Sequence, residues 1–149
     1  MKLRAYESDD WDAVCKIYDL GKPEELRGVV EPSSLVPLAS DPDMKSLFRA
    51  SQIVVAEDTG RVVGFAGNRG SFITWLFVHP QFRRRGVASA LVRHMVARLE
   101  PPVTLNVAAE NSAARALYQR LGFKVEREFL GNFQGRPCSV CKLRYETAA

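Results

Sequence analysis

The feature that most constrains the fold is a strand-like run joined to a helical run by a short arginine-rich turn. Residues 72–78 are apolar apart from one Thr and rich in β-prone side chains, and Pro80 stops the run. Residues 87–99 carry apolar side chains at helical spacing, and Pro101-Pro102 ends that pattern. Because an amphipathic helix must bury its apolar face, this order restricts the chain to folds in which helices pack against a sheet.

The turn between the two runs, Arg83-Arg84-Arg85-Gly86-Val87-Ala88, is predicted to bind an anion. A helix start leaves backbone N–H groups without internal partners and carries the positive end of the helix dipole, and the arginines add charge. Gly86 has no Cβ, so a phosphate can approach the backbone closely. A solvated charge run is the alternative interpretation. The position between a strand end and a helix start favours a phosphate-bearing ligand.

The remaining periodicities extend this unit into a larger sheet. Apolar and β-branched runs predict strands at 2–6, 52–57, 61–68, 72–78, 103–108, 124–133 and 137–145, the last two joined through Gln134-Gly135. Helical spacing predicts helices from a Ser8 N-cap to near Gly21, at 43–50, at 87–99, and from Asn111 or Ser112 to Gly122. Prolines between Gly21 and Asp43 favour a loop or short helices there.

This order of elements predicts an α/β (α+β) fold with a mixed, mostly antiparallel sheet of about six to seven strands and helices on both faces. A length of 149 residues fits a single domain over residues 1–149. No apolar run is long enough to cross a bilayer, and acidic residues stand where a secretory signal would be apolar. We therefore expect a cytoplasmic protein without a membrane partner.

Cysteine count and charge narrow the class of ligand. The 3 cysteines, an odd number, indicate reduced thiols. Cys138 and Cys141 form a C-x-x-C pair, but no second pair or His cluster completes a zinc site, so strand residues are favoured and no metal is expected. The net charge of +4 favours anionic ligands. Acids interleave the basic residues outside the arginine-rich turn, which favours a local anion site over nucleic acid.

Two segments, on these elements and in this order, resemble the GNAT superfamily of acyl-CoA-dependent N-acyltransferases. The first fits the family's pattern of a strand followed by [Q/R]-x-x-G-x-[G/A] and reads Leu76-Phe77-Val78-His79-Pro80-Gln81-Phe82-Arg83-Arg84-Arg85-Gly86-Val87-Ala88. The second is similar to the family's strand, Asn, helix with Tyr, and closing L-G-F, and runs from Asn106 through Asn111 and Tyr118 to Leu121-Gly122-Phe123. The order of elements extends the resemblance over nearly the whole chain, except residues 21–50.

The resemblance implies that acetyl-CoA is the cosubstrate. Backbone groups of Leu76, Phe77 and Val78 would pair with the pantetheine arm as an added strand. The residues that would hold the pyrophosphate are Arg83, Arg84, Arg85, Gly86, Val87, Ala88 and Ser89. In the family, the strands around this point splay apart and leave a cleft for the thioester.

Acyl transfer to an amine requires two proton movements. An alkyl ammonium, with a pKa of about 10, must lose a proton before it attacks, and the leaving thiolate, with a reference pKa of about 8.5, benefits from a nearby donor. Tyr118 occupies the family's general-acid position and shares a helix face with Asn111 and Arg115. A packing aromatic is the alternative for Tyr118. Asn111 is interpreted as an N-cap, a cofactor contact, or both.

The sequence departs from the family at the base. Many relatives carry a carboxylate in the strand before the phosphate turn or in the strand before the Asn, where this chain has Thr74-Trp75 and Asn106. Glu110 is expected to face solvent and His79 to end a strand. Deprotonation through ordered water at Asn106 or Thr74 is the preferred hypothesis. The acidic alternatives are Glu24, Glu25 and Glu31.

The predicted function is transfer of an acetyl group from acetyl-CoA to a primary amine. A small amine or amino-acid-like acceptor is slightly favoured over a protein or peptide N-terminus. Residues 21–43 and 129–137 should frame the acceptor cleft, but their charges give no clear substrate charge: Glu24, Glu25, Glu31, Arg27 and Arg136. The competing hypotheses are a non-catalytic acyl-CoA-binding module and a basic nucleic-acid-binding domain. Family members often pair through their late strands, so a homodimer is one expectation.

Overall fold

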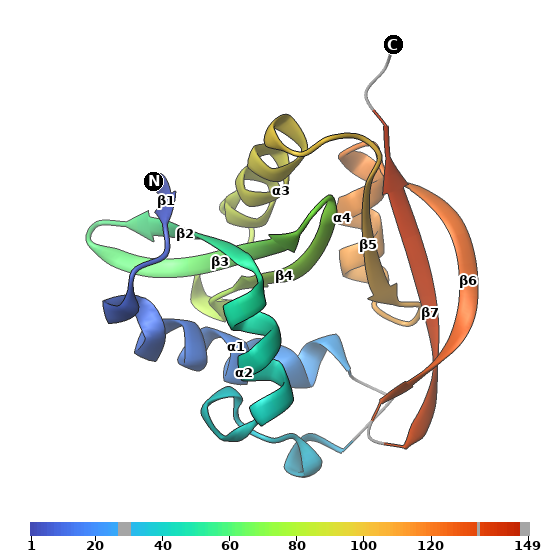
Figure 1. Cartoon of the computed structure of the whole chain (residues 1–149), viewed down its shortest axis with the longest axis horizontal. Coiled ribbons are helices and arrows are strands. Elements are labelled where there is room, and N and C mark those ends of the chain that lie inside the picture. Colours follow the sequence, from blue (N-terminus) through green and yellow to red (C-terminus); the bar gives the residue numbers. More distant parts are fainter. Residues whose placement is uncertain (27–30, 134, 147–149) are drawn as a thin grey trace.

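The computed structural model describes residues 1–26, 31–133 and 135–146 and has a seven-stranded sheet with helices on both faces (Figure 1). The strands are β1 (Lys2–Ala5), β2 (Gln52–Asp58), β3 (Arg61–Arg69), β4 (Phe72–Val78), β5 (Val103–Ala108), β6 (Lys124–Phe133) and β7 (Arg136–Tyr145). The α-helices are α1 (Trp11–Glu25), α2 (Pro42–Ala50), α3 (Val87–Arg98) and α4 (Ser112–Arg120). Short 3-10 turns lie at Ser8–Asp10, Pro32–Ser34, Leu38–Ser40 and Pro80–Phe82.

The sheet order β1-β2-β3-β4-β5-β7-β6 confirms the expected mixed, mostly antiparallel sheet. Every pair of neighbours is antiparallel except β4 and β5, which run parallel because α3 connects them as a crossover. Within the described ranges, no helix is long and apolar enough to span a membrane.

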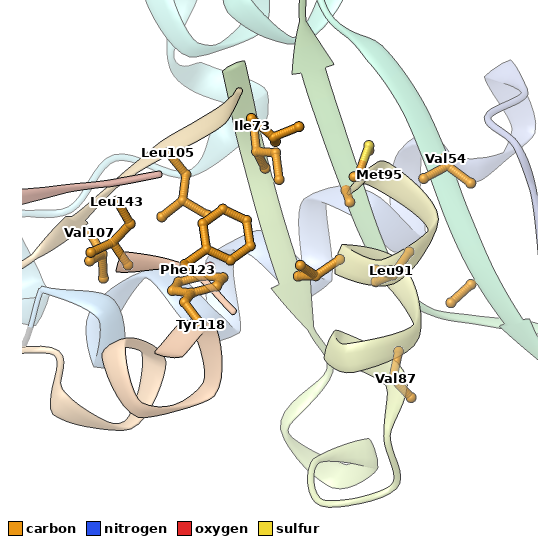
Figure 2. Close-up of a cluster of buried hydrophobic side chains, with 14 of the residues drawn as sticks. Val54, Ile73, Val87, Leu91, Met95, Leu105, Val107, Tyr118, Phe123 and Leu143 are labelled. Atoms are coloured by element: carbon orange, nitrogen blue, oxygen red, sulfur yellow. The ribbon is translucent and has the colours of Figure 1, made fainter. Parts of the chain in front are cut away.

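Two hydrophobic cores hold the helices to opposite faces of the sheet. One face packs α1 and α2 against β2, β3 and β4, with Ile17, Phe48 and Trp75 at its centre. The other face packs α3 and α4, with Leu91 and Tyr118 among its buried residues. Figure 2 shows the second core, where α3 and α4 contribute side chains to one layer against the strands. The apolar periodicities of the sequence therefore predict these buried faces correctly.

A β-bulge interrupts the ladder between β3 and β4 at Thr74. Gly67 pairs with Trp75 and Asn68 pairs with Ile73, so Thr74 is an extra residue without a partner in the β3–β4 ladder. The bulge reverses the side-chain alternation, so that Ile73 joins the α3 core while Trp75 joins the α1 core. A bulge also bends and twists its strand. Beyond it, β4 turns away from β5.

The β4–β5 ladder consequently has one register pair, Phe72 with Thr104. Toward their carboxyl ends the two strands move apart (Figure 1). This geometry confirms the splay implied by the family resemblance. It leaves the later part of β4 with β3 as a neighbour on one side and no strand on the other side among the described residues.

The first helix differs from the sequence prediction at both ends. Ser8 is not its N-cap: Glu7 caps a 3-10 turn, Asp10 returns a capping-box contact, and α1 begins at Trp11. The helix also continues past Gly21 to Glu25. Gly21 is not a left-handed stop, because its missing side chain makes room for the Phe77 ring, which would lie 3.0 Å from a Cβ placed there.

A buried ion pair anchors the start of α1 to the edge of the sheet. Arg4 donates two hydrogen bonds to the Asp10 carboxylate, at 2.8 and 2.9 Å, and its Nε donates to Glu57 at 3.2 Å. Asp10 is 6% exposed and also accepts from the Glu7 backbone N–H. The hydrogen bonds from Arg4 lower the pKa of Asp10 below its ordinary value of 3.8.

We expect Asp10→Asn to lower the free energy of unfolding at pH 7 by about 2 kcal/mol, the scale of a hydrogen bond to a charged group. The folded-state pKa of Asp10 is depressed, so its contribution is complete above the ordinary carboxyl pKa and is lost as the pH falls through the folded value. Urea unfolding should therefore show the difference from wild type shrinking in acid. The exposed neighbour variant Asp9→Asn is the control, and a cost for Asp10→Asn that stays constant in acid would contradict this origin.

Candidate functional site

The arginine-rich turn and the start of α3, residues 83–89, form what we call the anion cradle. Gly86 is the N-cap of α3 and offers no side-chain hydrogen bond. The Ala90 N–H donates to the Gly86 carbonyl at 3.0 Å, which starts the helical ladder. The N–H groups of Val87, Ala88 and Ser89 precede that bond and have no intrahelical acceptor. Backbone donors and the positive helix end therefore face outward together.

The backbone of the cradle is held in conformations that favour a close ligand approach. Gly86 has φ +79°, and Arg84 has φ 62°, a left-handed value that is uncommon for a residue with a side chain. A Cβ placed on Gly86 would meet no atom within 4 Å. The space above this backbone is open, which fits the predicted approach of a phosphate.

The three cradle arginines are all exposed but have different neighbours. Arg83 forms an ion pair with Glu24 at the end of α1, and the Arg85 guanidinium lies 5.1 Å from the centre of the Phe82 ring. Arg84 has no ion pair in the part of the chain that the structure describes. The guanidinium groups are therefore solvated in the free protein and can approach an anion from the surface.

The open edge of β4 lies directly before the cradle. Leu76, Phe77 and Val78 pair with Ala66, Phe65 and Gly64 of β3. On the side of β5 their backbone groups have no strand partner within the described residues, because the ladder ends at Phe72. A peptide-like ligand can add to this edge as a strand would.

Tyr118 lies on α4, facing the splay. Its ring packs edge-on against Phe123 with centroids 5.7 Å apart, and the residue is 7% exposed (Figure 2). Burial, followed by the charge of Glu25, raises the pKa of its hydroxyl above the ordinary value. The hydroxyl makes no hydrogen bond within residues 1–26, 31–133 and 135–146, yet it is not among the enclosed unpaired atoms, so it keeps contact with solvent. Tyr118 is therefore a packing aromatic, and its role as a proton donor stays a prediction.

Asn111 is the N-cap of α4, as the sequence predicts. Its Oδ1 accepts from the Ala114 N–H at 3.3 Å. Arg115, one turn further, donates to the Ala109 carbonyl at 2.8 Å. The Asn111 amide nitrogen has no hydrogen bond in the described chain, so the contact to a cofactor stays a prediction.

The candidates for the general base lie in different parts of the structure. His79 is buried, its Nδ1 accepts from the Gln81 N–H, and burial lowers its pKa, so it ends the strand as expected. Thr74 is occupied by a 2.9 Å hydrogen bond with Ser51. Asn106 is exposed on β5, and Glu110 and Glu31 are exposed as well. A water path at Asn106 or Thr74 stays a prediction, and Arg27 and Gln134 lie outside the described residues.

The last turn of α1 continues past the stop that the sequence predicts near Gly21 and contacts both the anion cradle and β4. Lys22 forms an ion pair with Glu25 at 3.2 Å, and its ammonium lies near the rings of Tyr18, Phe77 and Phe133. Lys22 and Phe133 lie in the segments that the sequence predicts to frame the acceptor cleft. Neither they nor Tyr18 could be singled out from the sequence, because their contacts join distant segments. A Lys three residues before a Glu on a helix was the available signal.

Two other features lie apart from the cradle. A shallow hollow of about 940 Å³ is at the opposite end of β4, lined by residues including Asn68, Phe72 and Arg98. Cys138 and Cys141 are buried strand residues of β7 with free thiols, as predicted. In the described segments, no group of three or more His, Cys, Asp or Glu side chains is arranged to hold a metal ion.

Comparisons with known proteins agree with this geometry. The family profile described as an Acetyltransferase (GNAT) domain matches residues 49–125. An acetyltransferase of Pectobacterium atrosepticum is 32% identical over 135 residues, covering 83% of this chain and 88% of that protein. A GCN5-related N-acetyltransferase from Rhodopseudomonas palustris has the same fold, with a TM-score of 0.78 at 18% identity, covering 97% of this chain and 94% of that chain. The Salmonella typhimurium protein yncA, solved with acetyl-CoA as its cofactor, has a TM-score of 0.73 at 18% identity, covering 100% and 96%.

Proposed function

This chain belongs to the GNAT acetyltransferase family, and on that premise we propose that it transfers the acetyl group of acetyl-CoA to a primary amine by direct attack of the amine on the thioester. The observation that carries the proposal is the uncapped start of α3 directly after the open edge of β4. One element offers free N–H groups and positive charge to phosphates, and the other offers a strand edge to an amide-containing arm. Acetyl-CoA contains both groups in one chain.

The residues present fit the cosubstrate. The cradle residues Arg83 to Ser89 would hold the pyrophosphate, because the backbone at Gly86 is open and the helix N–H groups are unpaired. Leu76, Phe77 and Val78 would align the arm along β4. Bound acetyl-CoA supplies the activated thioester carbon that an amine attacks.

Tyr118 is proposed to give a proton to the departing sulfur. A tyrosine hydroxyl is protonated at neutral pH, and burial raises the pKa of Tyr118 further. The hydroxyl has no hydrogen bond among the described residues that would hold its proton.

The acceptor is proposed to be a small amine or an amino-acid-like molecule. The alternatives are a protein or peptide N-terminus and, without turnover, an acyl-CoA-binding module. The decisive experiment is a screen of primary amines with acetyl-CoA, read by release of free thiol. Turnover with any amine supports the proposal, whereas tight coenzyme A binding without turnover across the panel would favour the binding module.

Gly86→Asp is expected to weaken coenzyme A binding about a hundredfold, because it adds a side chain at a positive φ and a negative charge against phosphate. Isothermal titration calorimetry measures the dissociation constant. Gly60→Asp is the matched control, since Gly60 has φ +80°, also has open space around its Cβ position, and lies in the β2–β3 turn. Equal affinities in the two variants would contradict the placement of the phosphates.

Tyr118→Phe is expected to lower kcat about a hundredfold, the usual scale for loss of a general acid, with coenzyme A affinity unchanged. Steady-state thiol release measures kcat, and calorimetry measures the affinity for coenzyme A. Tyr145→Phe removes a hydroxyl from a ring that also packs on Phe123 and serves as the control. A wild-type kcat for Tyr118→Phe would assign the proton to solvent or to another residue.

A further inference from the structure

Three aromatic rings from distant parts of the chain surround one ammonium group. The Lys22 Nζ lies 5.6 Å from the centroid of Tyr18, 5.9 Å from Phe77 and 5.5 Å from Phe133. These rings belong to α1, β4 and β6, so only the folded chain brings them together. Ring faces carry negative potential, and a cation within about 6 Å of a centroid is attracted to each of them.

A carboxylate completes this arrangement. Glu25 Oε2 lies 3.2 Å from Lys22 Nζ, in an ion pair that is not a hydrogen bond. This oxygen is enclosed and has no hydrogen bond, which is costly for a charged group. The Glu25 side chain as a whole is 34% accessible, so the rest of the group reaches solvent. The ion pair with Lys22 is therefore the contact that a ligand's ammonium group would replace at this oxygen.

The arrangement adjoins the site proposed for acetyl transfer. Phe77 belongs to the open edge of β4, along which the pantetheine arm would run. Burial, followed by the charge of Glu25, raises the pKa of both Tyr18 and Tyr118. The preceding residue, Glu24, pairs with Arg83 of the anion cradle. The last turn of α1 therefore borders the open edge of β4 and the anion cradle.

We propose that Tyr18, Phe77, Phe133 and Glu25 form the binding site for the acceptor's ammonium group, and that Glu25 is the base that deprotonates it. We call these four residues the ammonium site. This inference rests on the proposed function and deepens it, because it gives the acceptor a charge and the reaction a base. Lys22 occupies the site in the free protein and is displaced when the acceptor enters.

The proton transfers of the reaction balance with Glu25 as the base and Tyr118 as the acid. The acceptor ammonium has three N–H bonds, and the amide product keeps one. Glu25 takes the first proton and releases it to water through its accessible side. The freed nitrogen lone pair forms the C–N bond as the C–S bond breaks, and Tyr118 protonates the sulfur. The second nitrogen proton restores Tyr118, so the net products are the amide, the free thiol and one proton.

The chemistry of Lys22 identifies the class of acceptor. Its Nζ is a primary alkylammonium on an unbranched carbon chain, so a ligand with the same group can replace it against the same rings and carboxylate. A free aliphatic amine and a lysine side chain of a peptide share this chemistry. An acetylation assay that compares n-butylamine with a lysine-containing, N-terminally blocked tetrapeptide distinguishes these sources.

The test of the base uses n-butylamine and acetyl-CoA with the isosteric variant Glu25→Gln. We expect kcat at pH 7 to fall about a hundredfold, with coenzyme A affinity retained. We also expect kcat/KM of the variant to rise about tenfold per pH unit toward the amine pKa of about 10, because the amine must then lose its proton in solution. Asp12→Asn, an exposed carboxylate on the same helix, is the control and keeps the wild-type rate and profile.

The test of the ammonium site needs no turnover. Calorimetric titration of n-butylammonium chloride into the cofactor-free protein should show tighter binding to Lys22→Met than to wild type, since the resident ammonium is gone. Glu25→Gln should weaken that binding. The uncharged ligand n-butanol is the control and should bind none of the three proteins measurably.

The outcomes separate this inference from the proposed function. If wild type releases no thiol with any amine, the proposed function fails. If wild type turns over while Glu25→Gln keeps its rate and pH profile, Glu25 is not the base and a water path at Asn106 remains the explanation. If Lys22→Met binds n-butylammonium no better than wild type, the four residues are a structural contact and not an acceptor site.

Discussion

The end of pairing between β4 and β5 is the constraint on which the rest of the structure depends. Thr74 is an extra residue in β4, and the bulge that it forms bends the strand. Phe72 and Thr104 are then the one register pair between β4 and β5. Two consequences follow from this one bulge. The later part of β4 keeps backbone groups free for a ligand, and its alternation switches, so that Phe77 points toward α1 while Leu76 packs with the α3 core.

The opened sheet brings together the groups to which we assign roles in acetyl transfer. The start of α3 provides N–H groups and positive charge, β4 provides an edge, and α4 provides the Tyr118 hydroxyl from the opposite half. The last turn of α1 lies across the same region, with Glu24 paired to Arg83 and Lys22 set among three rings. The proposed base Glu25 also adds to the burial that raises the pKa of the proposed donor Tyr118.

The strands, α2, α3 and α4 follow from periodicity and local stop signals, because each is fixed by residues close in sequence. The turn and helix start of the anion cradle could be predicted for the same reason, since Gly86 and the arginines lie within a few residues of each other. The start and end of α1 were mispredicted because tertiary contacts override local signals there. The Asp10 carboxylate, held by Arg4 of β1, accepts from the Glu7 N–H, and α1 begins only at Trp11. Gly21 makes room for the Phe77 ring instead of ending the helix.

The amino-acid sequence alone determined the order of elements, the buried faces of the helices and the anion cradle, since periodicity, capping and turn chemistry are short-range. Only the tertiary structure decided how Lys22 and Glu25 meet Phe77 and Phe133, and which acidic side chain lies near Tyr118. Those contacts join segments far apart in the chain, and their geometry depends on a bulge and a helix length that packing sets. The local sequence pattern around Lys22 does not indicate that the rings of Phe77 and Phe133, far away in the chain, lie near its ammonium group.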